Sequence, residues 1–582
     1  MLAADESTQP VFDVLIIGAG PGGLAMASRL REPSPSALFT DEEHQRYHWI
    51  RKHGSRMSLK RRKSGSVIPS RGSGGGGGDC EKCATAKPQP QQQRYKMLVL
   101  DATSDNWLGR WDGLFGAFQI SHLRSPMFFH VDPADRDALL AWAYERGQQN
   151  ELLELRGCVG KEISKHLRKA RASRNPRRHS IVEINERERK DYFTPPQSLF
   201  SNHCQSVVDR YGLRDGVLRH ESVEDIEYGS FKYTSDDEKL FRVKTDKGGI
   251  HYAKTVVLAV GSGNSACIPK DIEGLHHTPG TPLPPRVCHA MMINGEFPDP
   301  SVSAIIAAGV RPANVLVVGG GLTSAQLADL AIRRGVGKVW HLVRGRSCQI
   351  KYFDADLAWV GKYRNVEQAN FWGAESDAER LRLIREARGG GSMTPMYYKR
   401  LKAHAAAGRL ELRTGIKVTA AEFDKESRTW TVSTEPALEE RVKMPAFDFI
   451  YFATGIDADI STLPFLEGLR KSYPIETQGG LPCLNDDLMW CDGVPLFVTG
   501  RFAGLRLGPF ATNLGGVRAG AERISWAIEE VLEAGRRAGG GGYDDGNNAE
   551  RGLVEAETDE LDFATGRNNM FRKLSIAEGD EW

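Results

Sequence analysis

Two glycine-rich turns, each directly after an apolar and β-branched run, constrain the fold of this chain more than any other feature. The first turn occupies residues 18–23 and follows the run at 12–17. The second occupies residues 319–324 and follows the run at 314–318. A buried strand, a tight glycine turn and a helix, in this order, form the fingerprint of a dinucleotide-binding unit. The sequence therefore predicts an α/β fold with two Rossmann-like units, each binding one dinucleotide.

The glycines of the first turn are expected to have separate roles around a pyrophosphate. Gly18 permits the turn, Gly20 lacks the Cβ that would block close approach, and Gly23 lets the helix pack on the strand. Gly22 belongs to the same turn, and the helix after it supplies amide donors and a partial positive charge. The corresponding candidates in the second turn are Gly319, Gly321, Thr323 and Ser324.

The two units differ in the charge that comes directly after their second strand. In the first unit, Asp41 and Glu42 end the next apolar run, and acids at this place typically bind a ribose. In the second unit, Arg344 and Arg346 follow the run at 338–343. Cations here favour a 2′-phosphate, so the sequence predicts NADPH rather than NADH in the second unit.

Composition excludes several classes of protein and partner. Of the 582 residues, 40% are hydrophobic and 26% are charged, which is typical of a globular chain. The 77 basic and 75 acidic residues nearly cancel, so the totals indicate neither nucleic-acid binding nor a polybasic membrane surface. Because the N-terminus lacks a signal-like region and no apolar run reaches about 20 residues, we expect a cytoplasmic protein without a membrane partner.

Runs that end on glycine suggest how the two units are nested. The apolar run at 255–260 and the run at 447–452 each enter a glycine-containing turn, as if closing a unit. The predicted organisation is a first dinucleotide-binding domain at 11–299 plus 447–535, an NADPH-binding domain at 300–446 and a disordered tail at 536–582.

Two polar segments are expected to lie outside the packed domains. Residues 54–93 are rich in Gly, Ser, Lys, Arg and Gln and predict a disordered insertion. The basic tract at 165–190 predicts a solvated surface. Within the insertion, Cys80 and Cys83 have metal or redox spacing but no second cysteine pair nearby, so no metal site is predicted.

Three further segments resemble one family. Residues 119–124, Gln-Ile-Ser-His-Leu-Arg, residues 194–200 and the Ala-Thr-Gly-Ile segment at 453–456 occur in the order found in class B flavin monooxygenases, including the N-hydroxylating ornithine and lysine monooxygenases. The resemblance covers roughly residues 12–530. It implies a two-dinucleotide flavoprotein with FAD and NADPH as cofactors.

The resemblance also implies roles for individual residues. Gln119 corresponds to a flavin contact, and Arg124 to a cation that faces substrate and nicotinamide. His289 is a candidate catalytic residue, and it begins His-Ala-Met where an N-hydroxylase would carry His-Ser-Ser. Since residues 356–359 also lack a substrate-binding Asn, ornithine and lysine are not favoured as substrates. The remaining cofactor candidates are Trp107, His122, Thr454, Gly455, Gly500, Pro509 and Asn513.

The function predicted from these features is that of an FAD- and NADPH-dependent monooxygenase acting with dioxygen on a small, amine-bearing or otherwise nucleophilic substrate. Such an enzyme needs little acid-base machinery because the flavin supplies the chemistry. Two alternatives stay open. One is a flavin reductase or NADPH oxidase without oxygen transfer, and the other is a non-enzymatic, nucleotide-sensing regulator resembling oxidative-stress-induced growth inhibitors. Homo-oligomer formation also stays open.

Overall fold

The computed structural model describes residues 10–32, 59–60, 67–68, 94–155, 189, 191–231, 239–263, 265–275, 283–293, 295–359, 364–436 and 444–539. Asp41, Glu42, Cys80, Cys83 and nearly all of the basic tract lie outside the described residues.

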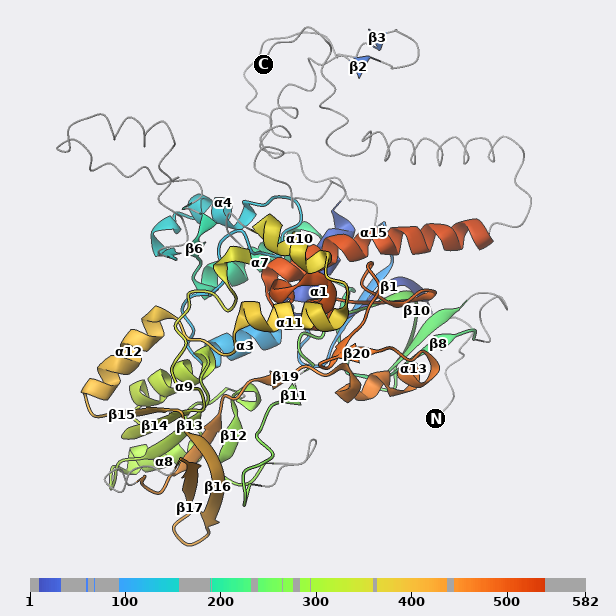
Figure 1. Ribbon diagram of the computed structural model, residues 1–582. Coiled ribbons are helices and arrows are strands. Elements are labelled where there is room, and N and C mark those ends of the chain that lie inside the picture. Colours follow the sequence, from blue (N-terminus) through green and yellow to red (C-terminus); the bar gives the residue numbers. More distant parts are fainter. Residues whose placement is uncertain are drawn as a thin grey trace, which may run out of the picture.

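The first sheet has eight strands and a largely parallel core (Figure 1). Its strands are β1 (Val11–Ile17), β4 (Met97–Asp101), β7 (Leu218–His220), β8 (Val223–Gly229), β9 (Leu240–Thr245), β10 (Ile250–Leu258), β22 (Met489–Cys491) and β23 (Val494–Val498). The order is β22-β23-β10-β1-β4-β7, and β9 joins β8 to the first half of β10. The strands from β23 to β7 are mutually parallel, so their carboxyl ends lie at one edge.

Apolar burial explains why β1 lies at the centre of this sheet. Val14, Leu15 and Ile16 are fully buried, as expected for a parallel strand covered on both faces. Helix α1 (Pro21–Arg31) begins directly after the first glycine turn and packs against the long helix α15 (Leu514–Gly539). Because α15 runs to Gly539, helical structure continues past the predicted start of the tail at 536.

The second sheet has five strands, all parallel, in the order β12-β18-β13-β14-β15. Its strands are β12 (Val287–His289), β13 (Asn314–Val318), β14 (Lys338–Val343), β15 (Leu410–Thr414) and β18 (Phe449–Phe452). Helices α8 (Pro300–Ala308), α9 (Leu322–Arg333) and α12 (Pro395–Ala406) belong to this part of the chain, as does the hairpin of β16 (Lys417–Asp424) and β17 (Thr429–Glu435). The coarse prediction of an α/β fold with parallel sheets is therefore confirmed.

The two connections between the sheets run side by side. Strand β11 (Ser265–Ala266) leaves the first sheet and pairs antiparallel with β19 (Ile456–Asp457), which returns to it. Next to this pair, the Cys267 amide donates to the Gly455 carbonyl at 3.1 Å. The second sheet is thus built from chain that lies between β10 and β22 of the first.

The remaining elements lie outside the two large sheets. The helices are α3 (Gly109–Ala117), α4 (Ala138–Glu145), α7 (Gln197–Arg210), α10 (Arg364–Trp372), α11 (Asp377–Arg388), α13 (Glu467–Ser472) and α14 (Gly504–Leu507). The short strands are β2 (Leu59–Lys60), β3 (Val67–Ile68), β5 (Leu153–Glu154), β6 (Phe193–Thr194), β20 (Thr477–Gln478) and β21 (Leu481–Pro482).

Candidate functional site

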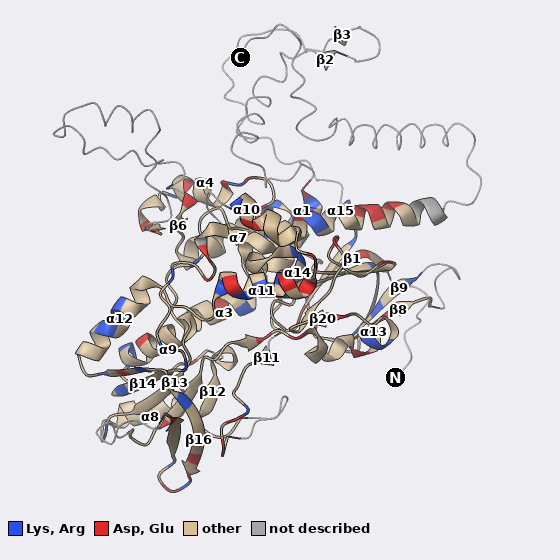
Figure 2. Ribbon diagram, viewed as in Figure 1, with Lys and Arg blue, Asp and Glu red and all other residues tan. Residues whose placement is uncertain are grey.

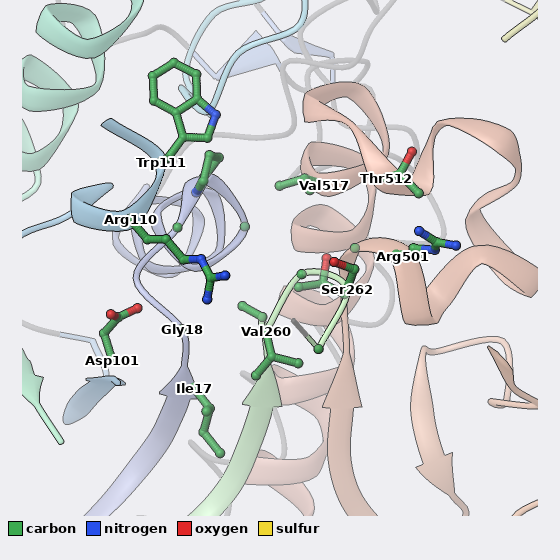
Figure 3. A pocket seen from close by; sticks show the side chains of 18 of the residues that line it. Ile17, Gly18, Asp101, Arg110, Trp111, Val260, Ser262, Arg501, Thr512 and Val517 are labelled. Atoms are coloured by element: carbon green, nitrogen blue, oxygen red, sulfur yellow. The ribbon is translucent and has the colours of Figure 1, made fainter. Parts of the chain in front are cut away.

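A cavity of about 750 Å³ crosses the carboxyl edge of the first sheet (Figure 3). Ile17 at the end of β1, Asp101 at the end of β4, Val260 after β10 and Gly500 after β23 all line it, and so does Val517 in α15. In open α/β sheets, ligands bind at this edge, outside the carboxyl ends of the strands. The volume lies within the range of about 300 to 1,000 Å³ typical of small-molecule and cofactor sites.

The first glycine turn forms the floor of the cavity. Gly18 has φ +108°, and a Cβ there would lie 2.5 Å from the carbonyl oxygen of Ala259. A Cβ at Gly23 would lie 1.9 Å from the carbonyl oxygen of Gly18, so helix α1 can pack here only on glycine. Gly20 differs, because a Cβ there would meet no described atom within 4 Å. Gly18 and Gly23 are thus required by the backbone, whereas Gly20, like Gly22, borders open cavity.

The acid at the end of the strand next to β1 is Asp101. Strand β4 pairs with β1 in the register Ile17 to Leu100, which places the Asp101 carboxylate beside the turn. Its Oδ2 accepts from the Ala19 amide at 2.8 Å and its Oδ1 from the Thr103 amide at 2.8 Å. Asp101 was not predicted from the sequence because the long insertion separates β4 from α1. The signal was present, since an apolar run ending in aspartate is typical of a ribose-binding strand.

Helix α3 supplies one wall of the cavity. Trp111, Leu114 and Phe115 line it, and the rings of Trp111 and Phe115 stack with centroids 3.9 Å apart. Arg110 precedes them, and Figure 3 shows its guanidinium close to Gly18, on the same side of the cavity as Asp101. Burial lowers the pKa of Arg110, and the Asp101 charge opposes that shift. This wall is apolar with a cation near the turn.

Arg124 lines the cavity, but its guanidinium is engaged with protein. Nε donates to the Tyr352 carbonyl at 2.7 Å, and Nη2 donates to the Lys351 and Phe353 carbonyls and to Oγ of Ser392. Burial lowers the pKa of Arg124 to about 10. The side chain therefore holds the segment at 351–353 against the first unit, so its guanidinium has a structural role.

A second arginine with a structural role lies at the far end of the cavity. Helix α11 carries acidic residues in its first turn and basic ones in its last, an arrangement favoured by the helix dipole (Figure 2). Arg388, in that last turn, donates to the Pro509 carbonyl at 3.1 Å and to Oγ1 of Thr512 at 2.7 Å. It also forms an ion pair with Asp354 at 3.1 Å. Asn513, which follows this contact and precedes α15, lines the cavity as well.

Three predicted flavin contacts lie outside this cavity. Gln119 has φ +51°, and its Oε1 accepts from Arg333 of helix α9 at 2.8 Å. His122 is half-buried, and its Nε2 donates to the Glu151 carbonyl at 2.9 Å. Trp107 is buried, and its indole donates to the Leu213 carbonyl at 2.9 Å. In this structure the three side chains join elements of the fold.

The second glycine turn repeats the geometry of the first. Gly319 has φ +151°, and a Cβ there would lie 2.3 Å from the carbonyl oxygen of Ala453. Gly321 is the N-cap of α9, and the Ser324 hydroxyl donates to its carbonyl at 2.8 Å. Beneath the turn, Nε2 of the buried His341 donates to the Gly319 carbonyl at 2.8 Å. Sequence reasoning missed His341, whose strand reads simply as apolar.

The surroundings of this second turn include both exposed cations and a second glycine segment. Thr323 is half-buried, and Arg344 and Arg346 are exposed directly after β14. Gly391 packs on the turn, since a Cβ there would lie 3.2 Å from the Cα atom of Gly321. A side chain at residue 391 would therefore crowd the turn.

The remaining predicted residues lie at the connections between the sheets. His289 ends β12 and is buried, and its Nδ1 accepts from the Met291 amide at 3.2 Å. Burial lowers the pKa of His289 to about 4, so the ring is neutral near pH 7. Thr454 donates to the Cys267 carbonyl, and Gly455 has φ +100°. None of these three lines the cavity, but the next residue, Ile456, does.

Two general properties hold for the described part of the chain. No helix there combines the length and apolarity needed to cross a bilayer. No group of three or more His, Cys, Asp or Glu side chains is arranged there to hold a metal ion.

Comparisons with known proteins find likeness in structure alone. No protein-family model matches the sequence, and no curated protein matches it. Among solved structures, ornithine hydroxylase PvdA from Pseudomonas aeruginosa is 15% identical, with 90% of this chain and 100% of that chain covered and a TM-score of 0.53. L-lysine 6-monooxygenase from Pseudomonas syringae is 17% identical, with 90% and 100% covered and a TM-score of 0.53.

A third neighbour acts on a different amine. The cadaverine monooxygenase DfoA from Erwinia amylovora, solved with FAD bound, is 15% identical, with 90% of this chain and 95% of that chain covered and a TM-score of 0.54. These structures confirm, at the level of the fold, the predicted resemblance to N-hydroxylating flavin monooxygenases.

Proposed function

We propose that this chain is an FAD- and NADPH-dependent oxidoreductase that acts as a monooxygenase on a small molecule. The observation that carries the proposal is the cavity on the carboxyl edge of the first sheet, floored by the turn at Gly18 and bordered by Asp101. The neighbours that share the fold are flavin monooxygenases, and one of them holds FAD. Their likeness supports the proposal but does not identify a substrate.

The residues at the first turn fit an extended dinucleotide. Gly20 leaves space where a pyrophosphate would approach, and the N-terminus of α1 faces that space with its amide donors. Asp101 would bind the ribose hydroxyls of the adenosine, and Arg110 would offset the pyrophosphate charge. Bound FAD would supply the redox chemistry, accepting hydride from NADPH and reducing dioxygen, so that one oxygen atom enters the substrate and the other leaves as water.

The opposite half of the cavity fits the flavin ring. Trp111 and Phe115 offer an apolar wall, and the segment from Thr512 to Asn513 leads into α15. An apolar wall excludes water, which protects reactive species from hydrolysis and strengthens electrostatic interactions in the site. Arg124 and Arg388 hold the loops on either side of this half in place, so we assign both of them to positioning.

The second turn fits NADPH in the same way. Gly319 and Gly321 place the N-terminus of α9 toward the ligand, and the exposed Arg344 and Arg346 are available to a 2′-phosphate. Together, the two nested sheets would form an FAD domain with an inserted NADPH domain, as the sequence predicts. Gly391 limits the space beside this turn, so any bulk added there should reduce NADPH binding.

Anaerobic mixing of the purified chain with NADPH, and separately with NADH, tests the proposal. Bleaching of the flavin absorption bands that is faster with NADPH is the expected result. Oxygen is then admitted with candidate substrates, and a fall in peroxide per NADPH consumed identifies a true substrate. Peroxide equal to NADPH with every substrate would indicate an oxidase, and a flavin that NADPH never reduces would indicate a regulator.

A further inference from the structure

The charges that line the cavity are unevenly placed. Four guanidinium groups and two carboxylates face it: Arg110, Arg124, Arg388, Arg501, Asp101 and Glu221. Both carboxylates belong to one side, because Asp101 ends β4 and Glu221 follows its neighbour β7. Arg501 follows β23, which β10, β1 and β4 separate from β7. The cavity therefore has an acidic side and a cationic side.

The acidic side is already neutralised by protein. The Glu221 carboxylate accepts from the Thr245 hydroxyl at 2.9 Å and pairs with the His251 ring at 2.8 Å. Asp101 accepts from two backbone amides and lies near the Arg110 charge. Both carboxylates are thus engaged by hydrogen bonds from the protein.

The cationic side contains two arginines, Arg388 and Arg501, that differ in their partners. Arg388 is paired with Asp354, whereas the guanidinium of Arg501 has no hydrogen bond or ion pair with any residue that the structure describes. Burial and, to a lesser degree, the Arg388 charge lower the pKa of Arg501, and the Asp457 charge opposes this shift. The Thr512 hydroxyl stands beside them, and Figure 3 shows Thr512 and Arg501 together, across the cavity from Asp101 and Arg110.

We propose that Arg501, supported by Arg388 and Thr512, binds the carboxylate or phosphate group of a small anionic substrate beside the flavin. This inference rests on the proposed function and names its substrate class. A half-buried guanidinium gains most from a charged acceptor, because charge-assisted hydrogen bonds are roughly twice as strong as neutral ones. A protonated amine at the same place would meet the like charge of the Arg501 guanidinium.

The flavin pyrophosphate does not account for this cation. It is expected over Gly18 and Gly20, on the side of the cavity where Figure 3 shows Arg110 and across the cavity from Arg501. The phosphates of NADPH are expected at the second turn, on the other sheet, near Arg344 and Arg346. An anion at Arg501 is therefore a separate ligand or a separate part of the substrate.

The test uses the full chain loaded with FAD and four probes of equal chain length: hexanoate, hexyl phosphate, hexylamine and hexanol. Binding is followed by changes in the flavin absorption bands at constant ionic strength. The variants are Arg501→Gln and Arg501→Lys, and the matched control is Arg382→Gln on the exposed face of α11, where Arg382 pairs with Glu379 and Glu386. FAD content and thermal unfolding are measured for each variant.

The expected result is that hexanoate or hexyl phosphate binds at least about tenfold more tightly than hexylamine, and that Arg501→Gln removes about tenfold of this affinity. Arg501→Lys should retain part of it, and Arg382→Gln should match the parent chain. The relative strength of the two anions distinguishes a carboxylate from a phosphate substrate.

Three outcomes would overturn the inference. Equal binding of hexylamine and the anions would show that the site does not select an anionic substrate. Unchanged anion affinity in Arg501→Gln would show that Arg501 does not bind the anion. Loss of FAD from a folded Arg501→Gln variant would show that Arg501 holds the flavin instead. A parent chain that binds no FAD would overturn the proposed function as well, so the two failures are distinguishable.

Discussion

Nε2 of His341 donates to the carbonyl oxygen of Gly319, 2.8 Å away, so the middle of strand β14 holds the second glycine turn from beneath. The imidazole is fully buried, and burial lowers its pKa to about 4. A neutral ring that donates from Nε2 is therefore the form present near pH 7. The turn depends on a residue that lies outside its own sequence.

His341→Leu should weaken NADPH binding and lower the free energy of unfolding. Leucine cannot donate, and leaving a buried carbonyl without a partner costs about 1–3 kcal/mol. His341→Gln keeps an N–H donor and should lose less of both. Thermal unfolding and NADPH titration of the two variants check this, and equal behaviour of Leu and Gln would show that the hydrogen bond is unimportant.

Stability should fall as the pH drops from about 6.5 to about 4. Burial lowers the pKa of His203, His289 and His341 to about 4 in the folded chain, whereas an unfolded histidine titrates near 6.5. Between these values the unfolded state binds more protons, so stability is full above about pH 6.5 and decreases below it by on the order of 1 kcal/mol per pH unit for each ring. Urea unfolding at pH 7.5, 6 and 5 measures this decrease in the free energy of unfolding. A constant free energy of unfolding over that range would contradict the burial of neutral rings.

Gly20→Val should give a folded protein without flavin. A Cβ at Gly20 meets no described atom within 4 Å, so the chain itself tolerates the substitution, but the branched side chain would fill space needed by a pyrophosphate. Gly23→Ala is the contrasting variant, because its Cβ would lie 1.9 Å from a backbone oxygen and should destabilise the fold. Flavin absorbance and thermal unfolding separate the two effects. Normal flavin content in Gly20→Val would mean that the cavity floor is misassigned.

Asp101→Asn should reduce FAD affinity by about tenfold or more, since a charged acceptor to the ribose hydroxyls is lost. The paired variant Asp41→Asn carries the same change at the acid that sequence reasoning favoured. Titration of each apo variant with FAD decides between them. If Asp41→Asn loses flavin and Asp101→Asn does not, the sequence-based assignment is the correct one.

Arg344→Glu should lower the ratio of NADPH affinity to NADH affinity by about tenfold or more. The reason is that a carboxylate repels the 2′-phosphate of NADPH and can accept hydrogen bonds from the ribose diol of NADH. Arg334→Glu makes the same charge change on the exposed C-cap of α9, at the opposite end from the glycine turn. The ratio of NADPH to NADH affinity is the readout. An unchanged ratio in Arg344→Glu would show that Arg344 does not bind the 2′-phosphate.

Some parts of the site were predicted from the sequence because they are local. The turn at Gly18 and the turn at Gly319 each follow a strand and open a helix within about a dozen residues, so their spacing alone carries the pattern. The structure places both at positive φ, where L side chains are rarely found. The α/β class follows from the same local order.

Gln119 shows where local similarity stops being informative. Its segment matches the family in sequence, yet its backbone has φ +51° and its side chain points to Arg333 on the second unit. The direction of a side chain depends on the packing of the elements around it. No motif encodes that packing.

The sequence by itself determined the two strand-turn-helix units, because hydrophobic period and glycine spacing act over short stretches. Only the tertiary structure decided which acid and which cations meet in the cavity. Asp101, Arg388 and Arg501 come from distant parts of the chain, and parallel pairing of β4, β1, β10 and β23 brings the ends of those strands to one edge. The order of strands in a parallel sheet depends on how both of its faces are buried by segments far apart in the sequence. Local sequence patterns therefore do not determine it.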